Sequence, residues 1–422
     1  MSTPPVPTEI SAASAGTQAP DRERFDDALD QAFQGVRGAL TELLASVGAD
    51  PGKPQDIARR FRINKNLAWK ISKIVTVTDP HAVISNIPGS TGMNTILSAF
   101  ATGGASESTL DAARDAVDRF DRMVEVHVGD RSTLELVLSS KAPHRVPTEH
   151  LHQTRKMAFQ GNSSIWGIQA RVKLASFFLA PSADDPTQLD TASLSGLLDV
   201  RRLRNDASVP LLMRFSYNDD GTVREGPRAT PINPTRSDDP LMLMPEFCSM
   251  PPPEFVAMDG AGYTRYQLAP GPIGNGGLNT WVSGEFIRGF APIYADEHNR
   301  VGEHAALVQL PVEWLVCDIQ VHRALAFAMT PRPVLFGQLV GGPGPGADSS
   351  CDRLPMAETM EPIGNGPPVV ATALVPGYSD MVARVYDRMG WRAKDFVGFR
   401  LVVRYPAMPT SYVIQHDLAP RG

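Results

Sequence analysis

The chain has 422 residues, enough for two or three domains with substantial cores, and its hydrophobic (42%) and charged (20%) fractions are ordinary for a globular protein. A net charge of −6 excludes a uniformly basic coat for nucleic acid, but not a small basic module attached to an acidic body. No apolar run approaches the roughly 20 residues that a membrane span needs, so we expect no membrane partner.

The cysteines and the N-terminus indicate the compartment. Cys248, Cys317 and Cys351 are far apart and odd in number, so they fit neither a zinc site nor a disulfide framework. Residues 1–20 are rich in Ser, Thr, Ala and Pro and lack the basic and apolar parts of a signal peptide. We therefore expect a disordered tail over 1–20 and a cytoplasmic protein.

Residues 21–141 predict an all-α domain of about six helices, of which the two longest each carry an apolar stripe at a spacing of three or four. The stripe of the first, over 21–47, is Phe25, Leu29, Phe33, Val36, Leu40 and Leu43. The second helix, capped by Ser106 or Ser108, has the stripe Leu110, Ala113, Val117, Phe120 and Val124. Shorter helices are expected from Asp79–Pro80, over 93–101, and after the cap residue Asp130.

The stretch from Lys53 to Val75 predicts two short helices joined by a tight turn at 61–63. The first turns Ile57 and Ala58 inward, and the second begins at Asn64. The apolar positions of the second helix are Leu67, Ala68, Ile71 and Ile74. Seven basic side chains stand against one acid, Asp56, and such a local excess in an acidic chain is typical of a duplex-binding face.

This stretch resembles the helix-turn-helix of bacterial DNA-binding regulators, over about residues 54–75 only. The motif has a small residue in the first helix, a hydrophobe after the turn and apolar packing positions in the second helix. Ala58, Ile63 and the pair Ala68 and Ile71 match these positions. The turn position that usually holds Gly is Arg62, where a positive φ costs a non-glycine residue about 1 kcal/mol.

The resemblance implies that the second helix enters the major groove of duplex DNA, where its exposed residues meet base edges. The implied groove-facing residues are Asn64, Lys65, Asn66, Trp69, Lys70 and Lys73. Arg59, Arg60 and Arg62 are implied to contact phosphates and to make binding depend on salt. The alternative is a helical hairpin with a solvated basic face, in which the partner of an exposed Trp69 is a neighbouring helix.

The two long apolar stripes allow two interpretations. Each is longer than a small three-helix core needs, so one of them could form a homodimer interface that matches a two-fold symmetric site on DNA. In the other interpretation, both stripes cover the two short helices within one chain.

Prolines at 143 and 147 interrupt regular structure, so we expect a linker over 142–158. Beyond it, residues 159–422 consist of short β-branched and aromatic runs and predict a β-rich α+β domain. One helix is expected within it, from Ser379 to Met389, closed by Gly390. The expected strands lie within 163–172, 173–181, 209–217, 264–270, 280–294, 305–321, 332–340, 369–375, 396–405 and 410–418.

Two polar clusters invite a chemical interpretation. His144, His150 and His152 lie around Glu149, but no fourth metal ligand is near them. His298 and His304 lie near three acids, Asp296, Glu297 and Glu303, in a segment that suits either acid–base chemistry or a solvated loop. The Gly-rich loops match no phosphate-binding pattern, and no familiar hydrolase or metalloenzyme motif is present. We expect no catalytic residue, cofactor or metal.

The sequence thus predicts a multidomain protein, with an N-terminal all-α helix-turn-helix domain followed by a β-rich α+β domain. We expect a transcriptional regulator that binds duplex DNA as a homodimer or higher homo-oligomer. Its C-terminal domain would sense a small-molecule effector or mediate assembly. The alternative is a structural or assembly protein whose β-rich body self-associates and whose helical domain binds partners. An enzyme within 159–422 is a third possibility.

Overall fold

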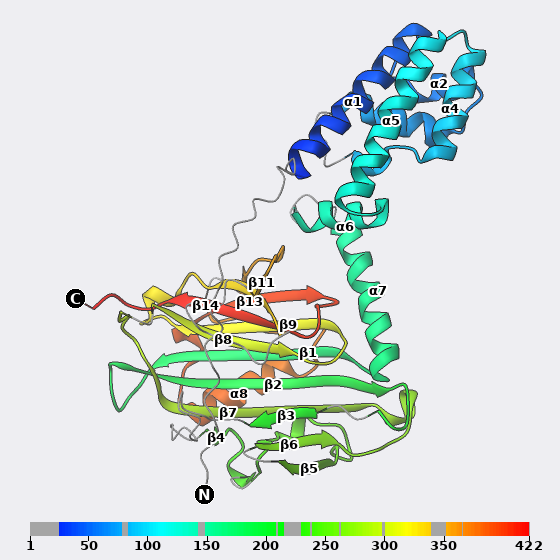
Figure 1. Ribbon diagram of the computed structural model, residues 1–422. Coiled ribbons are helices and arrows are strands. Elements are labelled where there is room, and N and C mark those ends of the chain that lie inside the picture. Colours follow the sequence, from blue (N-terminus) through cyan, green and yellow to red (C-terminus); the bar gives the residue numbers. More distant parts are fainter. Residues whose placement is uncertain are drawn as a thin grey trace, which may run out of the picture. The chain divides into compact units, whose positions relative to one another are not determined.

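In a computed structural model, the chain divides into two compact units, residues 1–145 and 146–422. The first is helical and the second is rich in β-strands, as the sequence predicts (Figure 1). The boundary falls inside the segment predicted as a linker. The structure describes residues 25–77, 83–141, 148–207, 210–214, 229–236, 239–260, 263–297, 300–338, 352–364 and 366–421.

Six α-helices build the described part of the first unit. They are α1 (Phe25–Ser46), α2 (Pro54–Arg60), α3 (Lys65–Thr76), α4 (Ser90–Thr102), α5 (Glu107–His127) and α6 (Arg131–Lys141). Two predicted caps are confirmed, because the Ser106 hydroxyl accepts a hydrogen bond from the Thr109 amide and Asp130 accepts one from the Thr133 amide. The helix start predicted at Asp79–Pro80 lies outside the described residues.

The core of the first unit forms mainly where α1 packs against α5 (Figure 1). Phe33 and Val36 of α1 and Phe120 of α5 are at most 1% exposed, so the two apolar stripes are buried within a single chain. Between α2 and α4, the Phe61 and Phe100 rings lie 4.4 Å apart. Most residues of both stripes therefore lie in the core of this unit, as the second interpretation expects.

The second unit begins with a helix that the sequence does not predict. Helix α7 (Thr148–Trp166) occupies most of the expected linker and the start of the first expected strand, so both expectations are wrong there. No proline falls within α7, and its inner side has partners in the β-rich unit. Arg155 pairs with Glu358, and the Phe159 ring lies 5.2 Å from that of Tyr405.

The strands of the second unit form three sheets. The seven-stranded sheet has the order β12 (Glu361–Pro362), β13 (Phe396–Arg404), β9 (Val312–His322), β1 (Ile168–Pro181), β2 (Gln188–Arg202), β7 (Asn279–Pro292) and β4 (Thr230–Pro231). The four-stranded sheet has the order β11 (Arg353–Leu354), β10 (Arg332–Gly337), β14 (Thr410–Asp417) and β8 (Val301–Val308). The small sheet has the order β3 (Pro210–Arg214), β6 (Tyr263–Leu268) and β5 (Phe255–Gly260).

The large sheet buries both of its faces, and helix α8 (Tyr378–Met389), predicted from the sequence, packs on one of them. Strands β1 and β9 run parallel, with Ala175 opposite Cys317 and Ser176 opposite Asp318. Because side chains alternate between faces, Cys317 joins the core shared with the four-stranded sheet, whereas Asp318 faces α8.

The strands of this unit differ from the sequence expectations at several points, and strand β5 falls outside every expected strand. Strand β2 is missing from the expected set, although it pairs with β1 on one side and β7 on the other. Residues 369–375, expected as a strand, form only an isolated bridge between Thr372 and Val375. None of the helices in the described ranges combines the length and apolar character that crossing a bilayer requires.

Candidate nucleic-acid interface

The turn between α2 and α3 has a defined geometry centred on Arg62. This residue has φ 52°, the left-handed conformation that usually favours glycine. The Ile63 amide donates to the Ala58 carbonyl (3.1 Å), which is the six-to-one hydrogen bond of a Schellman cap. Ile63 and Ala58 are both buried in the core of this unit, which holds the chain in the turn. The turn therefore fixes how α3 leaves α2.

Helix α3 starts at a side-chain cap and separates polar from apolar residues. The Asn64 side-chain oxygen accepts a hydrogen bond from the Asn66 amide (2.8 Å), so this oxygen caps the N-terminus of α3. On the inner side, Ala68, Ile71 and Ile74 are fully buried. At about 100° per residue, the residues predicted to face the groove, other than Asn64, fall within one arc of about 140° around the axis of α3. They are Lys65, Asn66, Trp69, Lys70 and Lys73.

The structure therefore brings these five residues of α3 together on one outward side of the helix. Trp69 is 45% exposed, as expected, and its ring centroid lies 5.5 Å from the Lys73 ammonium. Helix α3 carries no acidic residue that would neutralise the three lysines. The arc is thus a cationic surface with one large aromatic side chain within it.

The three arginines near the turn differ in their freedom to bind. Arg59 is paired with Asp56 (2.6 Å), but both side chains are largely exposed, so the pair is weak. Arg60 donates to the Gly48 carbonyl after α1 (3.1 Å) and lies over the Phe61 ring, which gives it a structural role. Arg62 is exposed. The fold therefore occupies Arg59 and Arg62 less than it occupies Arg60.

Charge is segregated between the elements of this unit. Helix α5 carries six acidic and three basic residues, and α1 carries four acidic residues and one basic residue. The segment from Lys53 to Val75 has seven basic residues and one acidic residue. Positive charge is thus concentrated on the α2–α3 hairpin, which would direct a polyanion there.

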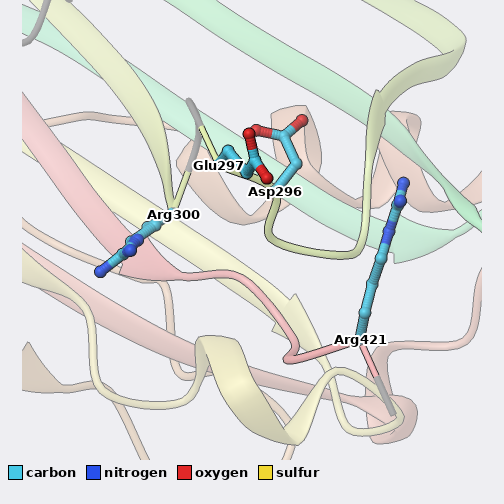
Figure 2. Close-up of a pocket in the computed structure, with 4 residues that line it drawn as sticks. All are labelled: Asp296, Glu297, Arg300 and Arg421. Carbon is cyan, nitrogen blue, oxygen red and sulfur yellow. The ribbon is translucent and has the colours of Figure 1, made fainter.

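The second polar cluster expected from the sequence does not assemble into a site. An open hollow of about 610 Å³ is lined by Asp296, Glu297, Arg300 and Arg421. In Figure 2 the two carboxylates lie together, whereas Arg300 extends away from them and Arg421 stands apart. His304 is buried in β8 instead, and His298 lies outside the described residues. Binding pockets usually have polar groups that converge on one point, and these do not.

The first polar cluster, for which the sequence offers no fourth metal ligand, is described only in part, because the side chains of His144, Glu149 and His150 lie outside the described part of the chain. Within that part, no three His, Cys, Asp or Glu side chains lie close enough to hold a metal ion.

A buried polar network between the large sheet and α8 was not predicted. Arg400 donates two hydrogen bonds of 2.8 Å to the Asp318 carboxylate, and the Tyr378 hydroxyl donates a third. Burial raises the pKa of Asp318, although its contacts with Arg400 and Tyr378 act in the opposite direction. A signal was present, since Asp318 directly follows the apolar run 315–317 and Arg400 directly precedes the apolar run 401–403. Because all its groups satisfy one another, the network has a structural role.

Lys173, His304 and His416 are further buried titratable side chains on the strands. The Lys173 ammonium lies 2.8 Å from the Ser195 hydroxyl, and burial lowers the pKa of Lys173 to about 8. His304 and His416 bring their Nε2 atoms within 3.4 Å of each other. The Lys173–Ser195 pair lies on paired central strands, β1 and β2.

No known protein family, curated protein or solved structure matches the chain.

Proposed function

We propose that the protein binds duplex DNA through α3, as a transcriptional regulator in the cytoplasm. The observation that carries the proposal is the uninterrupted outward arc of α3, with Lys65, Asn66, Trp69, Lys70 and Lys73 exposed or half-buried opposite a fully buried side. An α-helix of this kind fits the major groove, where lysine donates to guanine and asparagine pairs with adenine.

The α2–α3 hairpin supplies the remaining contacts. In this proposal, Arg59 and Arg62 bind phosphates and Arg60 braces α2 against the end of α1. Asn64 Oδ1 caps α3 by accepting the Asn66 amide N–H, which leaves the side-chain NH2 group of Asn64 to donate to DNA. The left-handed turn at Arg62 sets the angle at which α3 leaves the hairpin. The fold does not depend on Arg59 or Arg62, so both can be neutralised in a test.

The β-rich unit completes the regulator in this proposal. It would join copies into a homodimer or higher homo-oligomer, or bind a small-molecule effector that changes DNA affinity. Two copies related by a two-fold axis would then read two half-sites.

The test is fluorescence anisotropy of a labelled random-sequence duplex with the full chain across a salt series. Each lost phosphate contact lowers the slope of log affinity against log salt by about one, so Arg59→Gln with Arg62→Gln should lower it by about two. Arg114→Gln with Arg119→Gln removes the same charge from α5 and should leave the slope unchanged. Absence of binding at low salt would refute the proposal.

A second candidate, an assembly protein, is favoured by apolar side chains at one end of the large sheet. Three apolar residues are exposed at the junction of α7 with β1 and at the end of β2. They are Ile165, Trp166 and Leu203, which are 71%, 45% and 41% exposed. The Leu203 amide donates to the Gly167 carbonyl, which places these side chains at the same end. Light scattering that shows a large closed oligomer, lost on Ile165→Ser, would favour assembly over regulation.

A further inference from the structure

Trp69 occupies an unusual place for a large apolar side chain. It lies near the middle of the outward arc of α3, between Lys65 one turn before it and Lys73 one turn after it. Its ring is 45% exposed, while the core of the unit is filled from the opposite side by Ala68, Ile71 and Ile74. Tryptophan gives no propensity advantage in a helix. The fold therefore does not explain the exposed indole.

The surroundings of Trp69 indicate the kind of surface that would cover it. Lys65, Lys70 and Lys73 attract a polyanion, and α3 has no acid to oppose them. The major groove of B-DNA presents hydrogen-bonding groups on every base pair, but its only alkyl group is the 5-methyl of thymine. Of these groups, only the methyl gains from contact with the apolar face of an indole.

We infer that Trp69 contacts the thymine 5-methyl group in the major groove and makes the protein prefer A·T base pairs. This inference rests on the proposed function, because it requires α3 to lie in the groove. It adds a specificity-determining residue and names the base that this residue recognises. The lysines of the arc give affinity for any duplex, whereas Trp69 distinguishes A·T from G·C base pairs.

The test compares two duplexes that differ only in the methyl group, alternating poly(dA–dT) and alternating poly(dA–dU). Anisotropy competition with the full chain should show about fourfold tighter binding to the methylated duplex for each methyl buried. Trp69→Ala should bind both duplexes equally, and Trp69→Phe should keep part of the preference. Because Trp69 is exposed, these variants should keep the wild-type far-ultraviolet circular dichroism.

The outcomes separate this inference from the proposed function. Equal binding of wild type to both duplexes would overturn the role of Trp69 and leave DNA binding intact. Absence of binding to either duplex would overturn both. A third competitor, single-stranded oligo(dT), tests stacking on unpaired bases. If it competes better than poly(dA–dT) and quenches tryptophan fluorescence in the wild type but not in Trp69→Phe, the site takes single strands and the inference is wrong.

Discussion

The buried pair His304 and His416 should make the stability of the β-rich unit fall in mild acid. The two side chains are 9% and 1% exposed, and their Nε2 atoms lie 3.4 Å apart. His416 Nδ1 lies 2.9 Å from the Asp417 carbonyl, which can only accept, so Nδ1 carries the proton. His304 Nε2–H then donates to His416 Nε2. A proton added at His416 Nε2 would set two donors against each other.

The magnitude follows from the pKa of His304, which burial and, next, the nearby His416 lower from 6.5 to about 3. Between these values the unfolded chain binds a proton that the folded chain does not, so stability falls as the pH drops below 6.5. From pH 8 to pH 5, His304 alone should lower the free energy of unfolding by about 2 kcal/mol. Burial also lowers the pKa of His416, aided by Arg332 and opposed by Asp417.

The assay is urea unfolding at pH 8 and pH 5 in a Trp69→Phe background. The tryptophans that remain all lie in the β-rich unit, so their fluorescence reports on that unit: they are Trp166, Trp281, Trp314 and Trp391. His304→Gln keeps an N–H donor for His416 but does not titrate, so its loss between the two pH values should be about 2 kcal/mol smaller. An equal loss in both proteins would refute the reasoning.

Three further perturbations follow from the same contacts. Arg400→Ala leaves the fully buried Asp318 without its cation and should lower the free energy of unfolding in urea by about 3–5 kcal/mol. Arg400→Met combined with Asp318→Asn should lower it by less, and equal losses would contradict a buried ion pair. Burial lowers the pKa of Lys173 from 10.5 to about 8, so the free energy of unfolding of the wild type should increase as the pH is raised from 8 to 10.5. Lys173→Met should remove this increase and stabilise the unit at pH 7 by up to about 3 kcal/mol. An unchanged pH profile in the variant would contradict this. Arg62→Gly should stabilise the helical unit by up to about 1 kcal/mol in a thermal melt, because φ 52° strains arginine but not glycine, and a lower melting temperature would contradict that.

The helical unit was predictable because its signals are local. Apolar residues at a spacing of three or four gave α1 and α5, and capping side chains at Ser106 and Asp130 marked helix starts. Helix α7 escaped prediction because the prolines just before it indicated a linker, while the contacts that hold it, Arg155 with Glu358 and Phe159 with Tyr405, join residues more than 200 positions apart.

The β-rich unit was less predictable, because its order is set by long-range pairing. Strand β2 contains Asp, Ser and Gly, which are poor strand formers, and it is held in place by β1 and β7. For the candidate interface, the sequence predicted the exposure of Trp69 and the arc of α3. It did not show that Arg60 is occupied by the Gly48 carbonyl, or that Asn64 caps α3, since both depend on the folded hairpin.

The most direct test of the central claim is the affinity of the full chain for a random-sequence duplex when two lysines of the arc are removed. Lys70→Ala with Lys73→Ala should weaken binding at least tenfold at 0.1 M salt and flatten its salt dependence. Lys156→Ala with Lys394→Ala removes the same charge from exposed positions in the other unit and should change affinity little. Equal affinities of the two double variants would contradict DNA binding through α3.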